Sequence, residues 1–261
     1  MKQDTLSGLA VVTGAGQGIG RAIALQLLQA GCCVQAIGRS QEKLGSLATE
    51  AKVPADQVFV SPVDIQDTAA VSQAITQAEA ALGPVRYLVN AAGVLAPSRL
   101  LETSEDALLE TISINLTATV LVTQIVAKRM ADYRQGSIVT IGSNSGTTPR
   151  TGFGIYPASK AGVAHAMKCM ALELAETGVR CNIVSPGSTD TPMQAAAQTD
   201  EVGRERVLNG DLSNWRLGIP LGRMAEPSDV ADVVLFVLSD RARHITMENI
   251  VIDGGATLGA R

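Results

Sequence analysis

Aromatic residues and histidines are scarce in this chain of 261 residues. Phe, Trp and Tyr together make up 3% of it, and there are two histidines, His165 and His244. Few aromatic side chains leave little platform on which single-stranded bases could stack, and a net charge of −4 gives no electrostatic footprint for nucleic acid. Two distant histidines without neighbouring acids argue against a zinc site and against a histidine-based triad. We expect neither a metal nor a nucleic-acid partner.

Paired cysteines and long apolar runs are missing as well. Cys32, Cys33, Cys169 and Cys181 show no CxxC spacing, so we interpret them as small core residues of a reduced, cytoplasmic protein. No run of about 18 apolar residues predicts a membrane span, and the short apolar run near the N-terminus breaks at glycine, unlike a signal peptide. The hydrophobic fraction is nevertheless 46%, which is ample for a large core.

Short β-branched runs alternate with longer amphipathic stretches along the whole chain. The strands expected from these runs are 9–13, 32–38, 57–61, 86–90, 136–142, 179–184 and 249–253. The expected helices are 18–30, 41–51, 66–82, 104–132 and 155–177. The strands are continuously apolar, as strands covered on both faces are.

This alternation predicts an α/β fold in which residues 1–261 form a single domain. Its core would be a Rossmann-type, doubly wound parallel sheet of about seven strands with helices on both faces. The least regular stretch, at about 188–225, is interpreted as a lid over the substrate. Trp215 within it is interpreted as a packing or interface residue rather than a substrate ligand.

A glycine-rich turn, TGAGQGIG at residues 13–20, follows the first strand. Glycines allow positive φ angles and let backbone N–H groups approach a pyrophosphate at a helix N-terminus. A glycine cluster alone could be a tight turn, but its place between a strand and a helix predicts a dinucleotide site. The candidate ligands in this turn are Gly14, Gln17, Gly18, Ile19 and Gly20.

The residues after the second strand bear on which dinucleotide binds. NAD sites normally place an acid there, which bonds the ribose 2′-hydroxyl, whereas this chain has Gly38 followed by Arg39. A guanidinium without a competing carboxylate favours the 2′-phosphate of NADP, unless Arg39 is a solvated surface charge. Asp64, after the third strand, is a candidate for the adenine amino group, with turn formation as the alternative.

Several motifs stand in a fixed order: TGAGQGIG, NAAG at 90–93, Asn115 in ISINLTA, Ser143 in TIGSNSG, YPASK at 156–160 and SPG at 185–187. Together they resemble the short-chain dehydrogenase/reductase family over essentially the whole chain. The resemblance implies hydride transfer with a nicotinamide cofactor and a homotetramer. The catalytic tetrad it implies is Asn115, Ser143, Tyr156 and Lys160. The further cofactor contacts it implies are Asn90, Gly93, Tyr156, Lys160, Pro186, Gly187, Thr189 and Thr191.

Tyr156 and Lys160 lie at i, i+4 and would share one helix face. An unperturbed tyrosine titrates near pH 10, too high for a good base at neutral pH. An ammonium about 4 Å away at an effective dielectric of about 20 contributes roughly 4 kcal/mol, or about three pKa units. We therefore expect the pKa of Tyr156 to move toward neutrality, and the positive nicotinamide of an oxidised cofactor would push it the same way. Ser143 would hold the reacting oxygen, and the resemblance implies that Asn115 anchors a water in a proton relay with Lys160, helix packing being the alternative.

A narrower resemblance concerns TPRTGFGIY, GVRCNIVSPGSTDTPMQ, LGIPLGR and HITMENIVIDGGATLG. It is to the branch of the family that oxidises a cyclohexadiene diol acid to a dihydroxybenzoate in catecholate siderophore synthesis. A small acidic substrate needs a cation, and Arg150 suits bidentate carboxylate binding, unless it is a surface or interface arginine. Met193 and Gln194 are further pocket candidates.

The sequence leaves open which cofactor binds and which reaction is catalysed. That branch uses NAD with an acid after the second strand, which Gly38 and Arg39 do not match, so NAD or NADP stays open. A second hypothesis is an NADPH-dependent carbonyl or 3-oxoacyl thioester reductase. A third is a dinucleotide-binding regulatory protein without turnover, which the intact tetrad disfavours.

Overall fold

A parallel sheet organises the chain. The structure, a computed structural model, describes residues 6–197 and 201–259. Seven strands of the described chain pair in parallel in the order β3-β2-β1-β4-β5-β6-β9. Their bounds are β1 Gly8–Thr13, β2 Cys32–Gly38, β3 Val58–Pro62, β4 Val85–Asn90, β5 Gly136–Ile141, β6 Val179–Pro186 and β9 Asn249–Ile252. This confirms the predicted doubly wound α/β fold, a single Rossmann-like domain. The order reverses between β1 and β4, the position where such sheets bind ligands.

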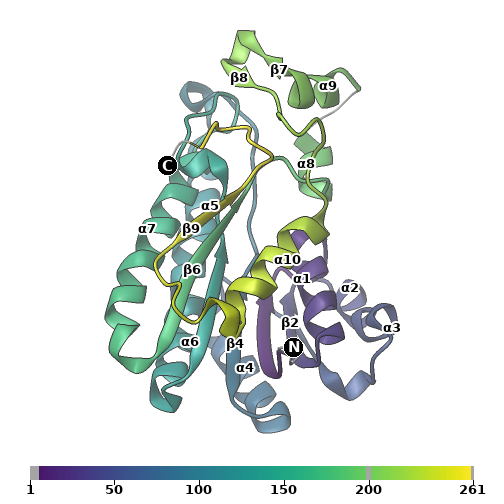
Figure 1. The fold of residues 1–261 in the computed structure, drawn as a ribbon, viewed down its shortest axis with the longest axis vertical. Coiled ribbons are helices and arrows are strands. Elements are labelled where there is room, and N and C mark those ends of the chain that lie inside the picture. The colour runs from purple at the N-terminus through teal and green to yellow at the C-terminus, as the bar shows by residue number, and fades with distance from the viewer. Residues whose placement is uncertain (1–5, 198–200, 260–261) are drawn as a thin grey trace.

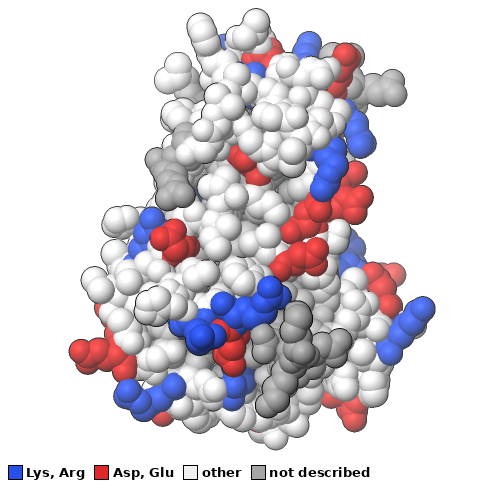
Figure 2. All heavy atoms as spheres, in the orientation of Figure 1, with Lys and Arg blue, Asp and Glu red and all other residues white. Residues whose placement is uncertain are grey.

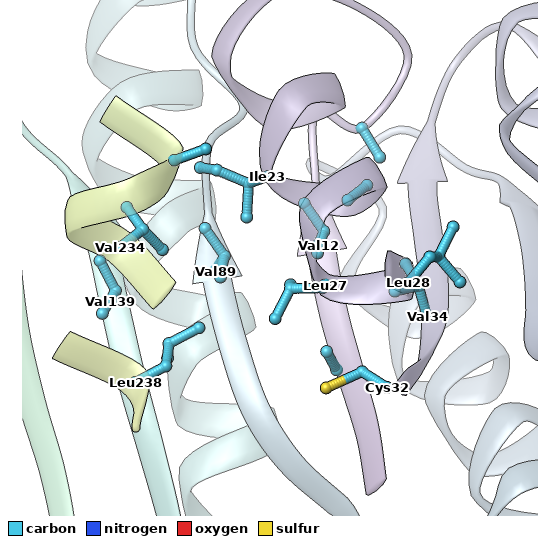
Figure 3. Close-up of a cluster of buried hydrophobic side chains, with 14 of the residues drawn as sticks. Val12, Ile23, Leu27, Leu28, Cys32, Val34, Val89, Val139, Val234 and Leu238 are labelled. Atoms are coloured by element: carbon cyan, nitrogen blue, oxygen red, sulfur yellow. The ribbon is translucent and has the colours of Figure 1, made fainter. Parts of the chain in front are cut away.

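Helices cover both faces of the sheet. One face carries α1 (Gly18–Gln29) and α10 (Pro227–Leu238), with the short α2 (Gln41–Gly45) and α3 (Leu47–Ala51) beside them. The other carries α4 (Thr68–Leu82), α6 (Thr119–Tyr133) and α7 (Tyr156–Leu174). Figure 3 shows side chains of α1 and α10 pointing onto β1, β2, β4 and β5. Alternate strand residues serve the two faces: Val12 packs in the first cluster and Val11 in the second.

Helix α10 lies outside the helices expected from the sequence. Its apolar run VVLFV has the β-branched character of a buried strand. Pro227 stands at its start, and the Asp229 carboxylate accepts a hydrogen bond from the Glu226 N–H at 2.8 Å. These are helix-start features. The expected helix 41–51 is also divided, because α2 ends at Gly45 and α3 begins at Leu47.

The expected helix 104–132 is one rod with an irregular centre. α5 (Glu105–Ile112) passes through a π-helical turn, Ser113–Ala118, into α6. The stretch Glu105–Tyr133 is long and apolar enough to cross a membrane by length and composition alone, a test that core helices covering a sheet also pass. In the fold its side chains Val122, Val126 and Met130 are buried in the second core cluster, as those of a helix covering a sheet are.

The cysteines are only partly core residues. Cys32 and Cys181 are buried, Cys33 is half-buried, and all four thiols are free. Cys169 is exposed on α7, so the prediction of a core position is wrong for it. Its helix turns that position away from the sheet, toward which Met167 points.

The predicted lid, 188–225, forms small elements of its own: α8 (Pro192–Ala197), α9 (Glu201–Asn209) and a hairpin of β7 (Gly210–Asp211) and β8 (Arg216–Leu217). Residues 198–200 of the lid, and residues 1–5 and 260–261 of the predicted domain, lie outside the described residues. Figure 1 shows α8, α9, β7 and β8 projecting from one end of the molecule. Trp215 in the hairpin is 87% exposed, so packing within the chain is not its role, while an interface role stays a prediction. On the face drawn in Figure 2, basic and acidic side chains are interspersed.

Candidate active site

A cavity of about 490 Å³ opens at the carboxyl ends of β1, β4, β5 and β6, around the point where the strand order reverses. All predicted site residues except Asn90 and Asn115 line it: Gly14, Gln17, Gly18, Ile19, Gly20, Arg39, Asp64, Gly93, Ser143, Arg150, Tyr156, Lys160, Pro186, Gly187, Thr189, Thr191, Met193 and Gln194. Predicted site residues from Gly14 to Gln194 therefore line one cavity. Among the described residues, no group of three or more His, Cys, Asp or Glu side chains is placed to hold a metal ion.

The glycine-rich turn is packed too closely for side chains. Gly14 has a φ of +69°, and a Cβ there would lie 2.8 Å from the backbone of Ala92. A Cβ on Gly20 would lie 2.4 Å from the Gly14 carbonyl oxygen. The Thr13 hydroxyl accepts hydrogen bonds from the N–H groups of Ala91 and Ala92, at 3.1 and 3.2 Å, which fixes the turn against the loop after β4.

This turn presents the N-terminus of α1 to the cavity. No side chain caps the helix at Gln17, and its first turn contains no acid. The partial positive charge of a helix N-terminus and its free N–H groups suit a phosphate. The cradle therefore fits the pyrophosphate of a dinucleotide.

The adenosine end of the cavity carries positive charge after β2. Arg39 is exposed and makes no hydrogen bond or ion pair with any residue that the structure describes. Ser40 caps α2, and Lys43 donates from Nζ to Gln17 Oε1 at 2.9 Å. Asp64 accepts the N–H of Gln66 at 2.9 Å, so it shapes its turn as well as lining the cavity.

The reactive side chains gather at the other end. Ser143 follows β5; its Oγ lies 2.8 Å from Ser145 Oγ, and its interaction with the Tyr156 hydroxyl lowers the pKa of that group. Tyr156 begins α7, and Lys160 follows one turn later. Lys160 Nζ lies 5.7 Å from the centre of the Tyr156 ring and donates to the Ile141 carbonyl at 2.8 Å. The predicted pair thus shares one helix face.

Burial dominates the acid–base chemistry of this pair. It raises the pKa of Tyr156 to about 12, against the hydrogen bond from Ser143, which lowers it. It also lowers the pKa of Lys160 to about 8. The expectation from the sequence left burial out, and the charge of Lys160 does not offset it; the contribution of a positive nicotinamide stays a prediction. The reason is that loss of water disfavours both the phenolate and the ammonium.

Asn115 and Asn90 lie behind the cavity wall. The π-helical turn aims Asn115 at the loop after β4, where its Oδ1 accepts the Val94 N–H at 2.8 Å and its Nδ2 donates to the Val94 carbonyl at 2.9 Å. Gly93 separates it from Lys160: a Cβ there would lie 3.1 Å from Asn115 Oδ1 and 3.6 Å from Lys160 Nζ. Asn90 donates to the hydroxyls of Thr123 and Thr140, at 2.8 and 3.0 Å, and so supports β4 rather than facing the cavity.

Sequence reasoning missed several wall residues. Lys43, Phe153 and Arg216 line the cavity. Phe153 packs edge-to-face on Tyr156, with ring centres 6.3 Å apart at 84°. Phe153 precedes the tyrosine by three residues, a spacing that could have indicated the contact. Arg216 stands in an irregular stretch without periodicity, so its charge among apolar neighbours was the one available signal.

Comparison with known proteins is consistent with this geometry. Residues 8–202 match the family model described as short chain dehydrogenase. The chain is 45% identical over 251 residues to 2,3-dihydro-2,3-dihydroxybenzoate dehydrogenase of Bacillus subtilis (strain 168), covering 96% of each chain. It is 39% identical over 250 residues to the enzyme of the same name from Escherichia coli (strain K12), covering 95% of this chain and 96% of that one. A solved structure of levodione reductase, 26% identical, superposes with a TM-score of 0.90 over 97% of this chain and 98% of that chain.

Proposed function

The chain belongs to the short-chain dehydrogenase family, a nicotinamide-dependent oxidoreductase family, and we propose that its reaction is the oxidation of 2,3-dihydro-2,3-dihydroxybenzoate to 2,3-dihydroxybenzoate. The observation that carries the proposal is the 45% identity over 96% of the chain to an enzyme of that activity. The cation Arg150 on the cavity wall supports it, because this substrate is a carboxylate. The product would serve the synthesis of a catecholate siderophore.

The bound nicotinamide supplies the hydride acceptor. Ser143 and Tyr156 would hold the C3 hydroxyl oxygen between their own oxygens. As the C3–H bond gives up its electron pair, Tyr156 takes the hydroxyl proton and the C–O bond becomes a carbonyl. The C2 proton then shifts to that oxygen, and the ring becomes aromatic without a further oxidant.

Tyr156 must lose its proton before each oxidation. With a pKa of about 12 it is protonated near neutral pH, and the positive nicotinamide of an oxidised cofactor would lower that pKa when it binds beside the ring. Lys160, with a pKa of about 8, exchanges protons readily near that pH. We assign Asn115 a positioning role: it holds the Gly93–Val94 backbone beside Lys160, where a relay water would sit.

For the cofactor we propose acceptance of NADP. The support is the exposed, unpaired Arg39 on the cavity wall, with Ser40 and Lys43 beside it among the described residues. Asp64 is the one acid of the described cavity wall, and it lies after β3 rather than β2. A 2′-phosphate would therefore meet cations and hydroxyl groups at the end of β2.

The same arginine favours a second candidate function. Reductases that use NADPH need the 2′-phosphate site and the same tetrad, so reduction of a carbonyl or 3-oxoacyl thioester is the alternative reaction. It differs in substrate, because a thioester has no ring carboxylate to place near Arg150.

The test is a cofactor-reduction assay with 2,3-dihydro-2,3-dihydroxybenzoate, run separately with NAD and NADP. We expect turnover and formation of 2,3-dihydroxybenzoate. No turnover with either cofactor, together with reduction of a 3-oxoacyl thioester by NADPH, would exclude the proposal in favour of the alternative.

A Tyr156→Phe variant tests the mechanism in the same assay. Because it lacks the proton acceptor, its kcat should fall by about 10²- to 10⁴-fold, while cofactor binding, followed by fluorescence titration, stays near that of the unmodified protein. Retained turnover would contradict the assignment of the base.

We also propose a cytoplasmic homotetramer in which 188–225 covers the substrate. The apolar side chains of Leu109 (57% exposed), Leu121 (38%) and Leu172 (68%) on α5, α6 and α7 support burial between copies. Sedimentation equilibrium should give four times the mass of the chain; a monomer would contradict the assembly.

A further inference from the structure

The substrate end of the cavity carries an excess of positive charge. The described wall contains five basic side chains, Arg39, Lys43, Arg150, Lys160 and Arg216, and one acid, Asp64. Arg39, Lys43 and Asp64 belong to the adenosine end, where the loops after β2 and β3 meet. Three cations thus remain at the reactive end, with apolar neighbours such as Phe153 and Ile219 and with no acid on that part of the wall. An enclosed set of like charges of this kind favours an anionic ligand.

Arg216 is held in place by the lid hairpin and by the loop after β6. It lies on β8, opposite Asp211 of β7, and its Nη2 donates to the Ser188 hydroxyl at 2.8 Å. The Asp211 carboxylate is engaged inside the hairpin, where it accepts from the Ser213 N–H at 3.0 Å and the Asn214 amide at 2.8 Å. It forms no ion pair with Arg216, whose guanidinium is half-buried without a carboxylate partner among the described residues.

The loop that carries Arg150 is tied to the same hairpin. Thr151 donates from its hydroxyl to the Asn214 backbone carbonyl at 3.3 Å, with the Asn214 side-chain oxygen at 3.2 Å. These contacts tie the loop of Arg150 to the hairpin that carries Arg216, which lies two residues beyond Asn214. Arg150 itself makes no hydrogen bond or ion pair with any described residue.

The positive charge of Arg150 reaches Arg216. Burial, and next the charge of Arg150, lower the pKa of Arg216, against the charge of Asp211, which raises it. Burial also lowers the pKa of Arg150, against the charge of Asp253, which raises it. The charges of Asp253 and Asp211 offset part of this, but neither carboxylate forms an ion pair with its arginine, so an anion between the two guanidinium groups would be favoured.

We propose that Arg216 is a second specificity-determining residue, which together with Arg150 binds the carboxylate of the substrate from two sides. The identity of the acid rests on the proposed function; the carboxylate-binding pair does not. A planar guanidinium on each side can donate to both carboxylate oxygens. Ser188 fixes the direction of one guanidinium and the Thr151–Asn214 contact fixes the spacing of the two loops.

Kinetics with a charged and a neutral substrate test the pair. Arg216→Gln and Arg150→Gln should each raise the KM for 2,3-dihydro-2,3-dihydroxybenzoate by about 10- to 100-fold, because a charge-assisted hydrogen bond is lost. The kcat/KM for its methyl ester should stay within about threefold, since the ester has no charge to bind. Equal losses with acid and ester would overturn the proposal and give Arg216 a structural role in the hairpin.

Matched variants separate charge from structure. Arg206→Gln removes an exposed arginine from α9, in the same segment but outside the cavity wall, and should leave both substrates unaffected. Arg216→Lys keeps the charge and loses the planar fork, so it should recover part of the affinity for the acid only. An Arg216→Gln protein that binds the acid as tightly as Arg216→Lys, or an effect of Arg206→Gln as large as that of Arg216→Gln, would contradict the proposal.

Product binding separates this inference from the proposed function. In calorimetric titrations, the unmodified protein should bind 2,3-dihydroxybenzoate more tightly than catechol, and Arg216→Gln should lose most of that preference. If the protein fails to oxidise the dihydrodiol acid but shows this pattern, the proposed function is wrong and the carboxylate pair stands. If it binds catechol and the acid equally, the pair is wrong whatever the protein oxidises.

Discussion

The glycine-rich turn and the lid hairpin border the same cavity, yet they are built in opposite ways. The turn stands on the central sheet, and its backbone is packed until a single Cβ would collide with it. The hairpin consists of strands of two residues each, and Leu212, Trp215 and Leu221 beside it are 88%, 87% and 73% exposed. Val207, Ile219, Met224 and Ala256 form the small cluster beneath it.

This difference separates two tasks. A pyrophosphate is recognised by backbone N–H groups, which only a rigid turn can place. The substrate is recognised by a few side chains, and a lightly supported hairpin can carry those. We therefore expect changes in the turn to affect stability and cofactor binding together, and changes in the hairpin to affect substrate alone.

The largest effect should come from Gly20→Ala. Its Cβ would lie 2.4 Å from the Gly14 carbonyl oxygen, a backbone atom that cannot swing aside. We expect a loss of about 3 kcal/mol or more in the free energy of unfolding, measured in urea, and weaker binding of the dinucleotide.

Gly45→Ala is the control, since a Cβ there meets nothing within 4 Å on the exposed α2. It should be neutral or stabilising by up to about 1 kcal/mol. A Gly20→Ala protein as stable as the control would remove the contrast between the turn and the hairpin.

Lys160→Met should change the pH dependence of stability. Burial lowers the pKa of Lys160 from 10.5 to about 8, so the folded state holds its proton less tightly than the unfolded state does. The penalty for burying the ammonium is therefore fully present below about pH 8 and disappears as the pH rises toward 10.5. Over this window the unmodified protein should gain up to about 3 kcal/mol relative to Lys160→Met.

Urea unfolding at intervals between pH 7 and pH 10 measures this difference, and Tyr156 is common to both proteins. A difference that stays constant with pH would mean that Lys160 is not held with a lowered pKa.

Arg39→Ala should weaken the binding of NADP much more than the binding of NAD. Loss of the exposed guanidinium is expected to raise the Kd of NADP by about 10- to 100-fold, because a charge-assisted contact to the 2′-phosphate is removed. The Kd of NAD should change by less than about threefold, so NAD is the internal control in a fluorescence titration of both. An equal change for both would show that Arg39 is a solvated surface charge.

The smallest effect should come from Trp215→Gly. Trp215 is 87% exposed and has a left-handed backbone with φ of +52°, which glycine adopts without strain. The free energy of unfolding should stay within about 1 kcal/mol, and kcat/KM should not change, since Trp215 does not line the cavity. A lower kcat/KM would give the hairpin tip a direct part in substrate binding.

The strands could be predicted because their continuous runs of apolar residues reflect burial on both faces of the sheet. β2, for example, begins and ends at the residues expected for it. α10 was not predicted because a short apolar run in a helix buried against a sheet has the same residue pattern as a buried strand. Its start is marked by the hydrogen bond to the Asp229 carboxylate rather than by periodicity.

The site divides in the same way. Tyr156, Lys160 and the glycines occur in local motifs, so their chemistry is visible in sequence. Arg216 is not, because its place beside Arg150 depends on contacts between Thr151 and Asn214, which are 63 positions apart. The expected fall in the pKa of Tyr156 left burial out for a related reason, because the burial of this side chain depends on the whole fold.

The π-helical turn at Ser113–Ala118 makes one rod out of two helices that are out of phase. An added residue rotates all that precedes it by about 100° relative to all that follows. The downstream part turns Val122 and Val126 to the sheet, while the upstream part leaves Leu109 facing outward. Deleting one residue from this turn would therefore shorten the rod very little, but it would re-aim one half of it and carry Asn115 away from the loop it holds.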